Sequence, residues 1–266
     1  MNCIGHFING KEIKGKSKDK LKVFNPSNGK MISFVHVGGK DEISEAINFA
    51  KKAQVEWEKV NVQKRTRIIR NFIELVNKNI DTLSINLSKE HGKTLLDSKG
   101  DIQRGIEVAE FCLGIPHLLK GEFSENVSEN IDMYSINQPV GITLGITPFN
   151  FPAMIPMWKF CPAIACGNAF ILKPSEKNPS VPIMLAKLFT EAGLPDGVLQ
   201  VINGDKTTVD NLIENKYIDA VGFVGSTPIA EYIYTKSSSF GKRVQCFGGA
   251  KNHMIIMPDA DLDQVS

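Results

Sequence analysis

From Val140 onward the chain alternates short apolar runs with amphipathic segments, and this alternation limits the possible folds more than any other feature. Helices are expected at 153–166, 181–192, 209–214 and 229–237. The apolar runs between them predict strands at 140–146, 169–174, 197–203, 220–225, 243–247 and 253–258. Nearly continuous apolar strands that alternate with such helices are typical of an α/β fold with a doubly wound parallel sheet, covered on both faces.

The first half of the chain is expected to be mainly helical after a short β start. Asn9-Gly10 and Asn28-Gly29 are hairpin dipeptides, so they predict tight turns within residues 1–40. Helical periodicity begins at residue 41 and continues over 62–79, 81–91 and 95–119, with Gly92 as a helix breaker. Residues 131–137 alternate in polarity and predict a strand closed by Pro139.

Charge and cysteine content exclude several classes of partner. The 31 basic and 29 acidic residues give a net charge of +2, which provides no reason to expect nucleic acid or a membrane as partner. The five cysteines show no zinc-site spacing and no disulfide pattern, so we expect reduced thiols and no metal. The start of the chain shows no secretion or import signal, and prolines interrupt the apolar stretch 149–170, so a cytoplasmic protein is expected.

Ligands of parallel sheets bind at the carboxyl ends of the strands, so the residues after each strand carry the functional hypotheses. Asn150 follows the first strand, where its amide could donate to a developing oxyanion. A turn-forming asparagine is the alternative, and it is the more common one for an isolated residue. Lys173 and Glu176 follow the second strand, where a ribose would lie, although their spacing alone favours a solvated loop.

Gly225 and Ser226 follow the fourth strand and precede a helix that begins near Pro228. A helix start with free amides and a hydroxyl suits a pyrophosphate, and an ordinary strand-to-helix turn explains the same residues equally well. The usual dinucleotide fingerprint GxGxxG is missing from the whole sequence.

Four segments in this order, PFNFP, GNAFILKPSE, AGLPDGVLQVINGD and FVGSTPIAEYI, resemble the aldehyde dehydrogenase superfamily. The resemblance implies a variant Rossmann fold that binds NAD without GxGxxG, which explains the missing fingerprint. It also implies that Thr147 and Phe149 line the nicotinamide side and that Asn150 is the oxyanion donor. This resemblance outweighs the alternative interpretations given above for these strand ends.

The same resemblance assigns the other end of the dinucleotide. Lys173 and Glu176 would hold the adenosine ribose, with Lys177 close by. Ser226 would meet the pyrophosphate. The resemblance further implies three regions: a discontinuous NAD-binding domain at 1–121 and 139–258, an oligomerisation strand segment at 122–138, and the start of a catalytic domain at 259–266.

The stretch RVQCFGGAKNH at 243–253 indicates a subfamily. Hydrolytic members carry a water-activating Glu in the corresponding ELGGK-like segment, where this chain has Cys246 or Phe247, depending on register. Neither side chain can act as that base. The stretch instead resembles the QxxxGAKNH signature of the methylmalonate-semialdehyde dehydrogenases, which pass the acyl group to CoA. Gly248 would then lie beside the nicotinamide.

The segment 90–111 also resembles this subfamily and assigns a role to Arg104. It matches an arginine that holds the carboxylate of the substrate, a task for which a bidentate guanidinium is well suited. The alternative is a surface ion pair of Arg104 with Asp101 or Glu107.

By resemblance, the nucleophilic cysteine lies in a GQRC- or GERC-like motif a few dozen residues beyond GGAKNH, whereas this sequence ends at Ser266. We therefore expect the catalytic domain to be absent and the chain to be inactive alone. Cys161 and Cys166 lie on an apolar helix and are expected to be core residues. Cys246 belongs to a strand end rather than to a nucleophile loop.

The activity implied for the complete enzyme is NAD-dependent oxidation of malonate or methylmalonate semialdehyde to acetyl-CoA or propionyl-CoA, with CoA as acyl acceptor. The complete enzyme is expected to be a homo-oligomer, either a dimer or a tetramer. Two alternatives remain open: a non-catalytic NAD-binding or oligomerising fragment, and a general hydrolytic aldehyde dehydrogenase. The missing Glu at 246–247 argues against the second.

Overall fold

The apolar runs of the second half form the centre of the fold, because their near-continuous hydrophobicity allows burial from both sides. A computed structural model describes residues 3–265 of the chain. Its main sheet has seven strands in the order β12-β11-β8-β9-β10-β2-β3. The first five of these run parallel: β12 (Arg243–Phe247), β11 (Ala220–Val224), β8 (Ile142–Ile146), β9 (Ala169–Lys173) and β10 (Leu199–Val201).

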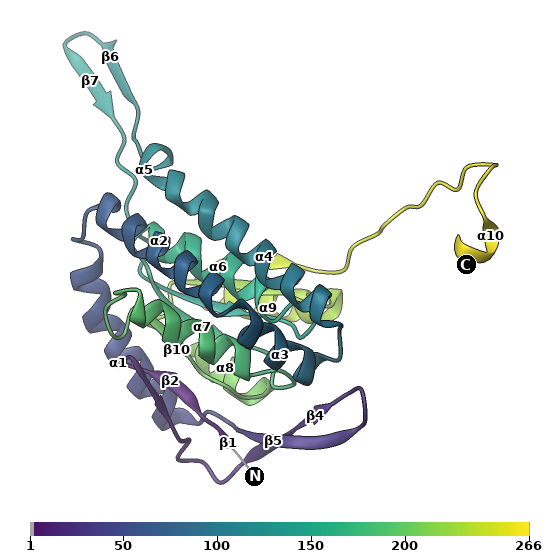
Figure 1. Cartoon of the computed structure of the whole chain (residues 1–266). Helices are drawn as coiled ribbons and strands as arrows, with labels where there is room; N and C mark the ends of the chain where they lie inside the picture. Colours follow the sequence, from purple (N-terminus) through teal and green to yellow (C-terminus); the bar gives the residue numbers. More distant parts are fainter. Residues whose placement is uncertain (1–2, 266) are drawn as a thin grey trace.

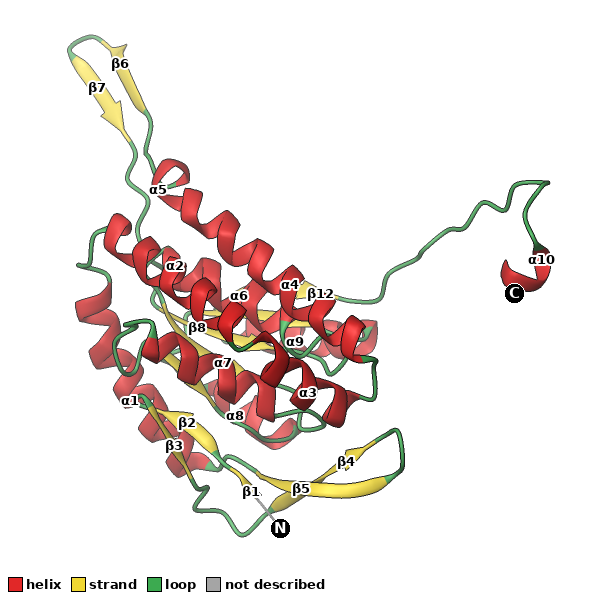
Figure 2. Ribbon diagram, viewed as in Figure 1, coloured by secondary structure: helices red, strands yellow, loops and turns green. Residues whose placement is uncertain are grey.

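Both faces of this sheet are covered by helices, as the sequence predicts (Figures 1 and 2). Alternate residues of β9 belong to different cores: Ala169 and Ile171 to one, Phe170 and Leu172 to the other. The first core contains residues of α1 (Lys40–Trp57), α8 (Lys206–Glu214) and α9 (Thr227–Ser239). The second contains residues of α2 (Val62–Lys78), α3 (Ile80–His91), α4 (Leu95–Phe111), α6 (Met154–Ala165) and α7 (Ser180–Glu191).

The two predicted hairpin turns are confirmed. Asn9 and Gly10 have φ of 50° and 74° and join β2 (His6–Ile8) to β3 (Lys11–Ile13). Gly29, with φ of 67°, lies in the turn between β4 (Lys20–Asn25) and β5 (Lys30–His36), and β1 (Cys3–Ile4) pairs with β5. The periodicity did not show that β2 pairs antiparallel with β10 and thereby extends the main sheet.

Two predicted elements differ from the structure, and one strand was not predicted. The helix predicted at 95–119 ends at Phe111 and continues as a 3-10 turn and the short α5 (Ile115–Leu118), because Gly114 favours helix ends and Pro116 lacks an amide hydrogen. The polar stretch before Asn130 forms β6 (Phe123–Ser128), which pairs with the anticipated strand β7 (Ile131–Tyr134). This hairpin projects away from the body (Figure 1).

The strand predicted at 253–258 is wrong. After β12 the chain runs away from the body, and residues 248–257 are exposed and have no regular structure up to a turn before α10 (Leu262–Val265) (Figure 1). The apolar sequence MIIM favours a strand, but strand pairing requires a neighbouring sheet edge, and none lies beside this segment in the described residues. None of the described helices is long and apolar enough to cross a membrane.

The N-terminal strand β2 is held to the sheet by a buried histidine. His6 is fully buried, and its Nδ1 accepts the backbone N–H of Asn203 at 3.1 Å. The Asn203 side chain donates in return to the carbonyl of Gly5 at 2.6 Å. Burial lowers the pKa of His6 from 6.5 to about 4, although the nearby carboxylate of Glu42 opposes that shift.

This lowered pKa predicts an acid-labile fold. The unfolded chain takes up the proton near pH 6.5, whereas folded His6 does so only near pH 4, so the free energy of unfolding falls as the pH falls between these values. The loss attributable to His6 is roughly 3 kcal/mol. Urea unfolding of wild type and His6→Gln at pH 7 and pH 4 measures it, and the variant should show a shallower pH dependence. His117→Gln, at an exposed position, is the control, and a His6→Gln profile parallel to that of wild type would contradict the assignment.

Candidate functional site

Three strand ends meet at one edge of the sheet, because β11, β8 and β9 are parallel neighbours. A cavity of about 530 Å³ opens there. It is lined by seven of the residues that the sequence singles out: Thr147, Phe149, Lys173, Glu176, Lys177, Gly225 and Ser226. Three other predicted residues, Asn150, Gly248 and Arg104, do not line it.

Lys173 and Glu176 form the charged pair of the cavity wall. Lys173 is only 6% exposed, and its Nζ lies 3.2 Å from Oε2 of Glu176. Burial lowers the pKa of Lys173, and the carboxylate of Glu176 counteracts this. Pro174 ends β9 directly after the lysine, so the glutamate three residues later turns back toward it. A carboxylate beside an ammonium can bind vicinal hydroxyls from both sides, because one accepts and the other donates.

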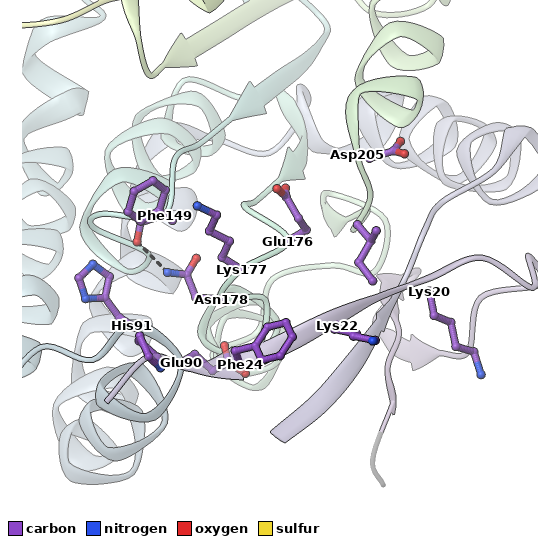
Figure 3. A pocket seen from close by; sticks show the side chains of 12 residues that line it. Lys20, Lys22, Phe24, Glu90, His91, Phe149, Glu176, Lys177, Asn178 and Asp205 are labelled. Carbon is purple, nitrogen blue, oxygen red and sulfur yellow. Dashed lines mark hydrogen bonds between the residues drawn. The ribbon is translucent and has the colours of Figure 1, made fainter. Parts of the chain in front are cut away.

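The end of β8 contributes Thr147 and Phe149. Thr147 is buried, its N–H donates to the carbonyl of Lys173 at 3.2 Å, and its hydroxyl has no hydrogen-bond partner. The ring of Phe149 is half-exposed, and Nζ of Lys177 lies 4.4 Å from its centroid. Nδ2 of Asn178 donates to the Phe149 carbonyl at 2.7 Å and joins the two loops, as the dashed line in Figure 3 shows. No pattern in the sequence predicts this role of Asn178.

The end of β11 contributes the start of α9. Ser226 is the N-cap residue in extended conformation, and its side chain makes no capping hydrogen bond, so its hydroxyl and the first amides of α9 are available to a ligand. Gly225 precedes it, and a Cβ at 225 would come within 2.4 Å of the Phe223 ring. Only glycine therefore fits here without displacing that ring.

The far part of the cavity is a slot between α8 and α9. Val209 lines it from α8, and Ile229 and Ile233 line it from α9. Tyr232 also lines it, and its hydroxyl donates to Asp210 at 2.7 Å, which ties the two helices together. An apolar slot of this kind suits a flat ring system.

Asn150 is exposed, and the loop that carries it is fixed by a buried ion pair. Nζ of Lys93 donates to the carbonyl of Asn150 at 3.0 Å and lies 3.1 Å from Oδ2 of Asp101. Oδ1 of Asp101 accepts the N–H of Met154 at 2.8 Å, and the carboxylate is fully buried. Neither Lys93 nor Asp101 was identified as a site residue from the sequence. The oxyanion role of the Asn150 side chain stays a prediction.

Arg104 lies exposed on α4 and forms no ion pair with any residue between Cys3 and Val265. The surface pair with Asp101 is excluded, because that carboxylate is buried and bound by Lys93. Its carbonyl accepts Nε1–H of Trp158 at 3.4 Å, and within residues 3–265 no hydrogen bond of the guanidinium is found. The guanidinium is thus available, and its substrate role stays a prediction.

Gly248 follows β12 and lies beside the first turn of α9. The N–H of Gly249 donates to Oγ1 of Thr227 at 2.9 Å, and a Cβ at 248 would come within 3.0 Å of the same oxygen. Gly248 thus lies beside Thr227, the residue that follows Ser226, and outside the cavity lining. Its proximity to a nicotinamide stays a prediction.

Four thiols, those of Cys112, Cys161, Cys166 and Cys246, lack the environment of a nucleophile. Burial raises the pKa of Cys112 to about 12 and raises the pKa of Cys161, Cys166 and Cys246. A nucleophilic cysteine requires a lowered pKa, because the thiolate is the reactive form. Cys161 packs in the core as expected. Within residues 3–265 there is also no group of three or more side chains that could hold a metal ion.

The chain is similar in sequence to known proteins over nearly its whole length. The model of the aldehyde dehydrogenase family matches residues 13–266. The malonate-semialdehyde dehydrogenase of Pseudomonas aeruginosa is 50% identical over 99% of this chain and 53% of its own length. A mitochondrial methylmalonate-semialdehyde dehydrogenase [acylating] of Arabidopsis thaliana is 44% identical over 98% of this chain and 43% of its own length.

A crystal structure has the same fold. It is that of a Sinorhizobium meliloti protein assigned as a methylmalonate-semialdehyde dehydrogenase and complexed with NAD. It superposes with a TM-score of 0.96 and 58% identity over 100% of this chain and 54% of that chain. The chain spans about half the length of the relatives it matches. Because the family model covers nearly all of the sequence, the chain belongs to the aldehyde dehydrogenase family.

Proposed function

We propose that this chain forms the NAD-binding part of a CoA-acylating malonate- or methylmalonate-semialdehyde dehydrogenase. One observation carries the proposal: residues from three separate strand ends line a single cavity that contains the pair of buried Lys173 with Glu176. The same cavity contains the Thr147 hydroxyl, which has no hydrogen-bond partner among the described residues, and the Ser226 hydroxyl, which makes no capping bond to α9. The names of the relatives supply the substrate class, and the NAD in the Sinorhizobium structure supports the cofactor.

The chemical groups of the cavity fit the parts of NAD. Glu176 would accept the adenosine ribose hydroxyls and Lys173 would donate to them, with Lys177 nearby. Ser226 and the amides of α9 would meet the pyrophosphate. The slot beside Val209 would hold the adenine. Thr147, Phe149 and Gly248 would lie on the nicotinamide side. When bound, NAD supplies the acceptor for the hydride that leaves the substrate.

Two residues outside the cavity would act on the semialdehyde. The amide of Asn150 would donate to the oxygen that becomes negatively charged, from a loop fixed by Lys93. The unpaired guanidinium of Arg104 would bind the carboxylate that malonate and methylmalonate semialdehyde share. By the family resemblance, Cys246 or Phe247, depending on register, would occupy the position where hydrolytic members have a base. We therefore assign the acyl acceptor as the thiol of CoA, which needs no such base.

The five cysteines of this chain do not include the nucleophile, so the 266-residue chain is expected to be inactive. Incubation with malonate semialdehyde, NAD and CoA should give no NADH absorbance above background, while calorimetric titration of the same preparation should show NAD binding. Turnover that Cys246→Ser abolishes would contradict the assignment of the thiols. A preparation that folds but does not bind NAD would refute the proposed function itself.

We also propose the regional roles that the family resemblance implies: an NAD-binding domain at 1–121 and 139–258, an oligomerisation strand segment at 122–138, and the beginning of the catalytic domain at 259–266. The hairpin within 122–138 exposes Phe123, Ile131, Met133 and Tyr134, and apolar side chains gathered on a projecting hairpin suit contact with a second copy. Light scattering should show a homo-oligomer that Met133→Asp weakens.

The reduced thiols favour a cytoplasm-like compartment.

A further inference from the structure

The first turn of α8 is bonded to segments that lie far away in the sequence. The carbonyl of Gly38 accepts the hydroxyl of Thr208 at 2.8 Å, and the N–H of Gly38 donates to the carbonyl of Asn203 at 2.8 Å. Asn203 is in turn bonded to the N-terminal strand β2, through its N–H to His6 and through its side chain to Gly5. The bonds that involve side chains are all buried. The position of this helical turn therefore depends on β2.

The same turn forms part of the wall of the cavity at the three strand ends. Lys206 and Val209 line that cavity on either side of Thr208 in the sequence. The loop before α8 packs directly on the turn, because a Cβ at Gly204 would come within 2.0 Å of Oγ1 of Thr208. All three residues of the turn move together, since they belong to one turn of a helix. The buried bonds beneath α8 thus determine where the two lining residues lie.

The ring of His6 makes one hydrogen bond among the described residues, and its partner is Asn203. The ring is fully buried, Nδ1 accepts the N–H of Asn203 at 3.1 Å, and Nε2 has no partner. An accepting Nδ1 indicates a neutral ring with its proton on Nε2. Burial lowers the pKa of His6 to about 4, while Glu42 raises it and His36 lowers it, so the ring stays neutral at pH 7.

A histidine at position 6 is not explained by core packing alone. The next two residues of β2, Phe7 and Ile8, are buried in apolar clusters on opposite faces of the sheet. A polar ring in such a place costs free energy unless it is hydrogen-bonded. An apolar side chain at position 6 would leave the N–H of Asn203 buried and unpaired. The acceptor of His6 therefore serves the loop that leads into α8.

We propose that His6 is a positioning residue of the cofactor cavity. Through Asn203 it holds the first turn of α8, and with it Lys206 and Val209, in the place that the adenosine part of NAD requires. The N-terminal strand β2 is then part of the cofactor site, although none of its residues lines the cavity. This inference rests on the proposed function, which supplies NAD as the ligand.

Calorimetric titration of ADP-ribose into the 266-residue chain tests the inference, because this probe contains the adenosine and the pyrophosphate of NAD. His6→Leu removes the acceptor and should weaken ADP-ribose binding by about tenfold. His6→Asn should restore the affinity to within about threefold of the parent, since Oδ1 of an asparagine can accept where Nδ1 of the histidine does. Such a rescue is not expected if position 6 serves only to fill the core.

Thr208→Val tests the other end of the same set of bonds. It keeps the shape of the side chain, removes the bond to Gly38, and should weaken ADP-ribose binding by about fivefold. Thr190→Val is the matched control, because the hydroxyl of Thr190 donates to the carbonyl of Ala186 within α7. Val76→Ala, in the core beneath α2, controls for lost stability. Both controls should leave the affinity within about twofold of the parent.

Three results would overturn the inference: parental ADP-ribose affinity in the folded variants of His6 and Thr208, equal weakening by Val76→Ala, or no recovery in His6→Asn. A thermal melt shows which variants are folded at the temperature of the titration. If His6→Leu does not fold, the comparison of Thr208→Val with Thr190→Val decides the question. A folded parent chain that binds neither NAD nor ADP-ribose refutes the proposed function, whereas binding that is insensitive to these substitutions refutes only the role of His6.

Discussion

Glu176→Gln should weaken NAD binding by about 10- to 100-fold. The carboxylate is the acceptor for the ribose hydroxyls in the proposed arrangement, and a hydrogen bond to a charged group contributes about 1.5–3 kcal/mol. The amide keeps the shape of the side chain but loses the charge that also pairs with Lys173. Isothermal titration of NAD into both proteins gives the ratio of the dissociation constants.

Glu191→Gln is the matched control for this experiment. Glu191 lies exposed at the end of α7 and has no ion pair among the described residues, so its substitution should leave NAD affinity within about twofold. A thermal melt of Glu176→Gln shows whether the fold survives the change. If the folded variant binds NAD as tightly as wild type, Glu176 does not contact the dinucleotide.

Asp101→Ala should reduce the free energy of unfolding by about 3–5 kcal/mol, the usual cost of breaking a buried ion pair by removing one partner. The fully buried carboxylate balances Lys93, which is only 11% exposed, and it accepts the N–H of Met154 at the start of α6. Its loss leaves an ammonium and an amide without partners in the interior. Urea unfolding at pH 7 measures the change.

The exposed pair between Lys99 and Asp81 provides the contrast. Its two side chains are 47% and 77% exposed, so Asp81→Asn should cost less than about 1 kcal/mol. Equal losses for Asp101→Ala and Asp81→Asn would show that the buried pair does not fix the loop of Asn150.

Local periodicity was sufficient to predict the α/β class and the positions of most elements. The helix predicted at 62–79 is α2 within one residue, and Gly92 ends α3 in the left-handed conformation with φ of 88°. These features depend on side-chain spacing and backbone freedom within a few residues. These features can therefore be predicted without knowledge of the rest of the chain.

The errors occurred where the outcome depends on distant partners. The sequence of 253–258 favours a strand, but no sheet edge lies beside it. The contact of β2 with β10 joins residues almost two hundred positions apart, as the bond from Asn203 to His6 shows. Periodicity cannot reveal which edges meet.

The candidate site likewise contains residues that the sequence predicts and residues whose roles depend on distant partners. Strand-end reasoning pointed to Lys173, Glu176 and Ser226, which line one cavity. It missed Lys93 and Asp101, because their roles arise only when the loop after β8 packs against α4. Their sequence context shows two ordinary charged residues near a helix start.

The central claim is that three strand ends hold one NAD molecule together. A crystal structure of the chain soaked with NAD tests it most directly. Electron density for the dinucleotide is expected in the cavity between Lys173, Glu176 and Ser226, with its ribose against the carboxylate. An empty cavity at saturating NAD, or a dinucleotide bound elsewhere on the chain, would contradict the account.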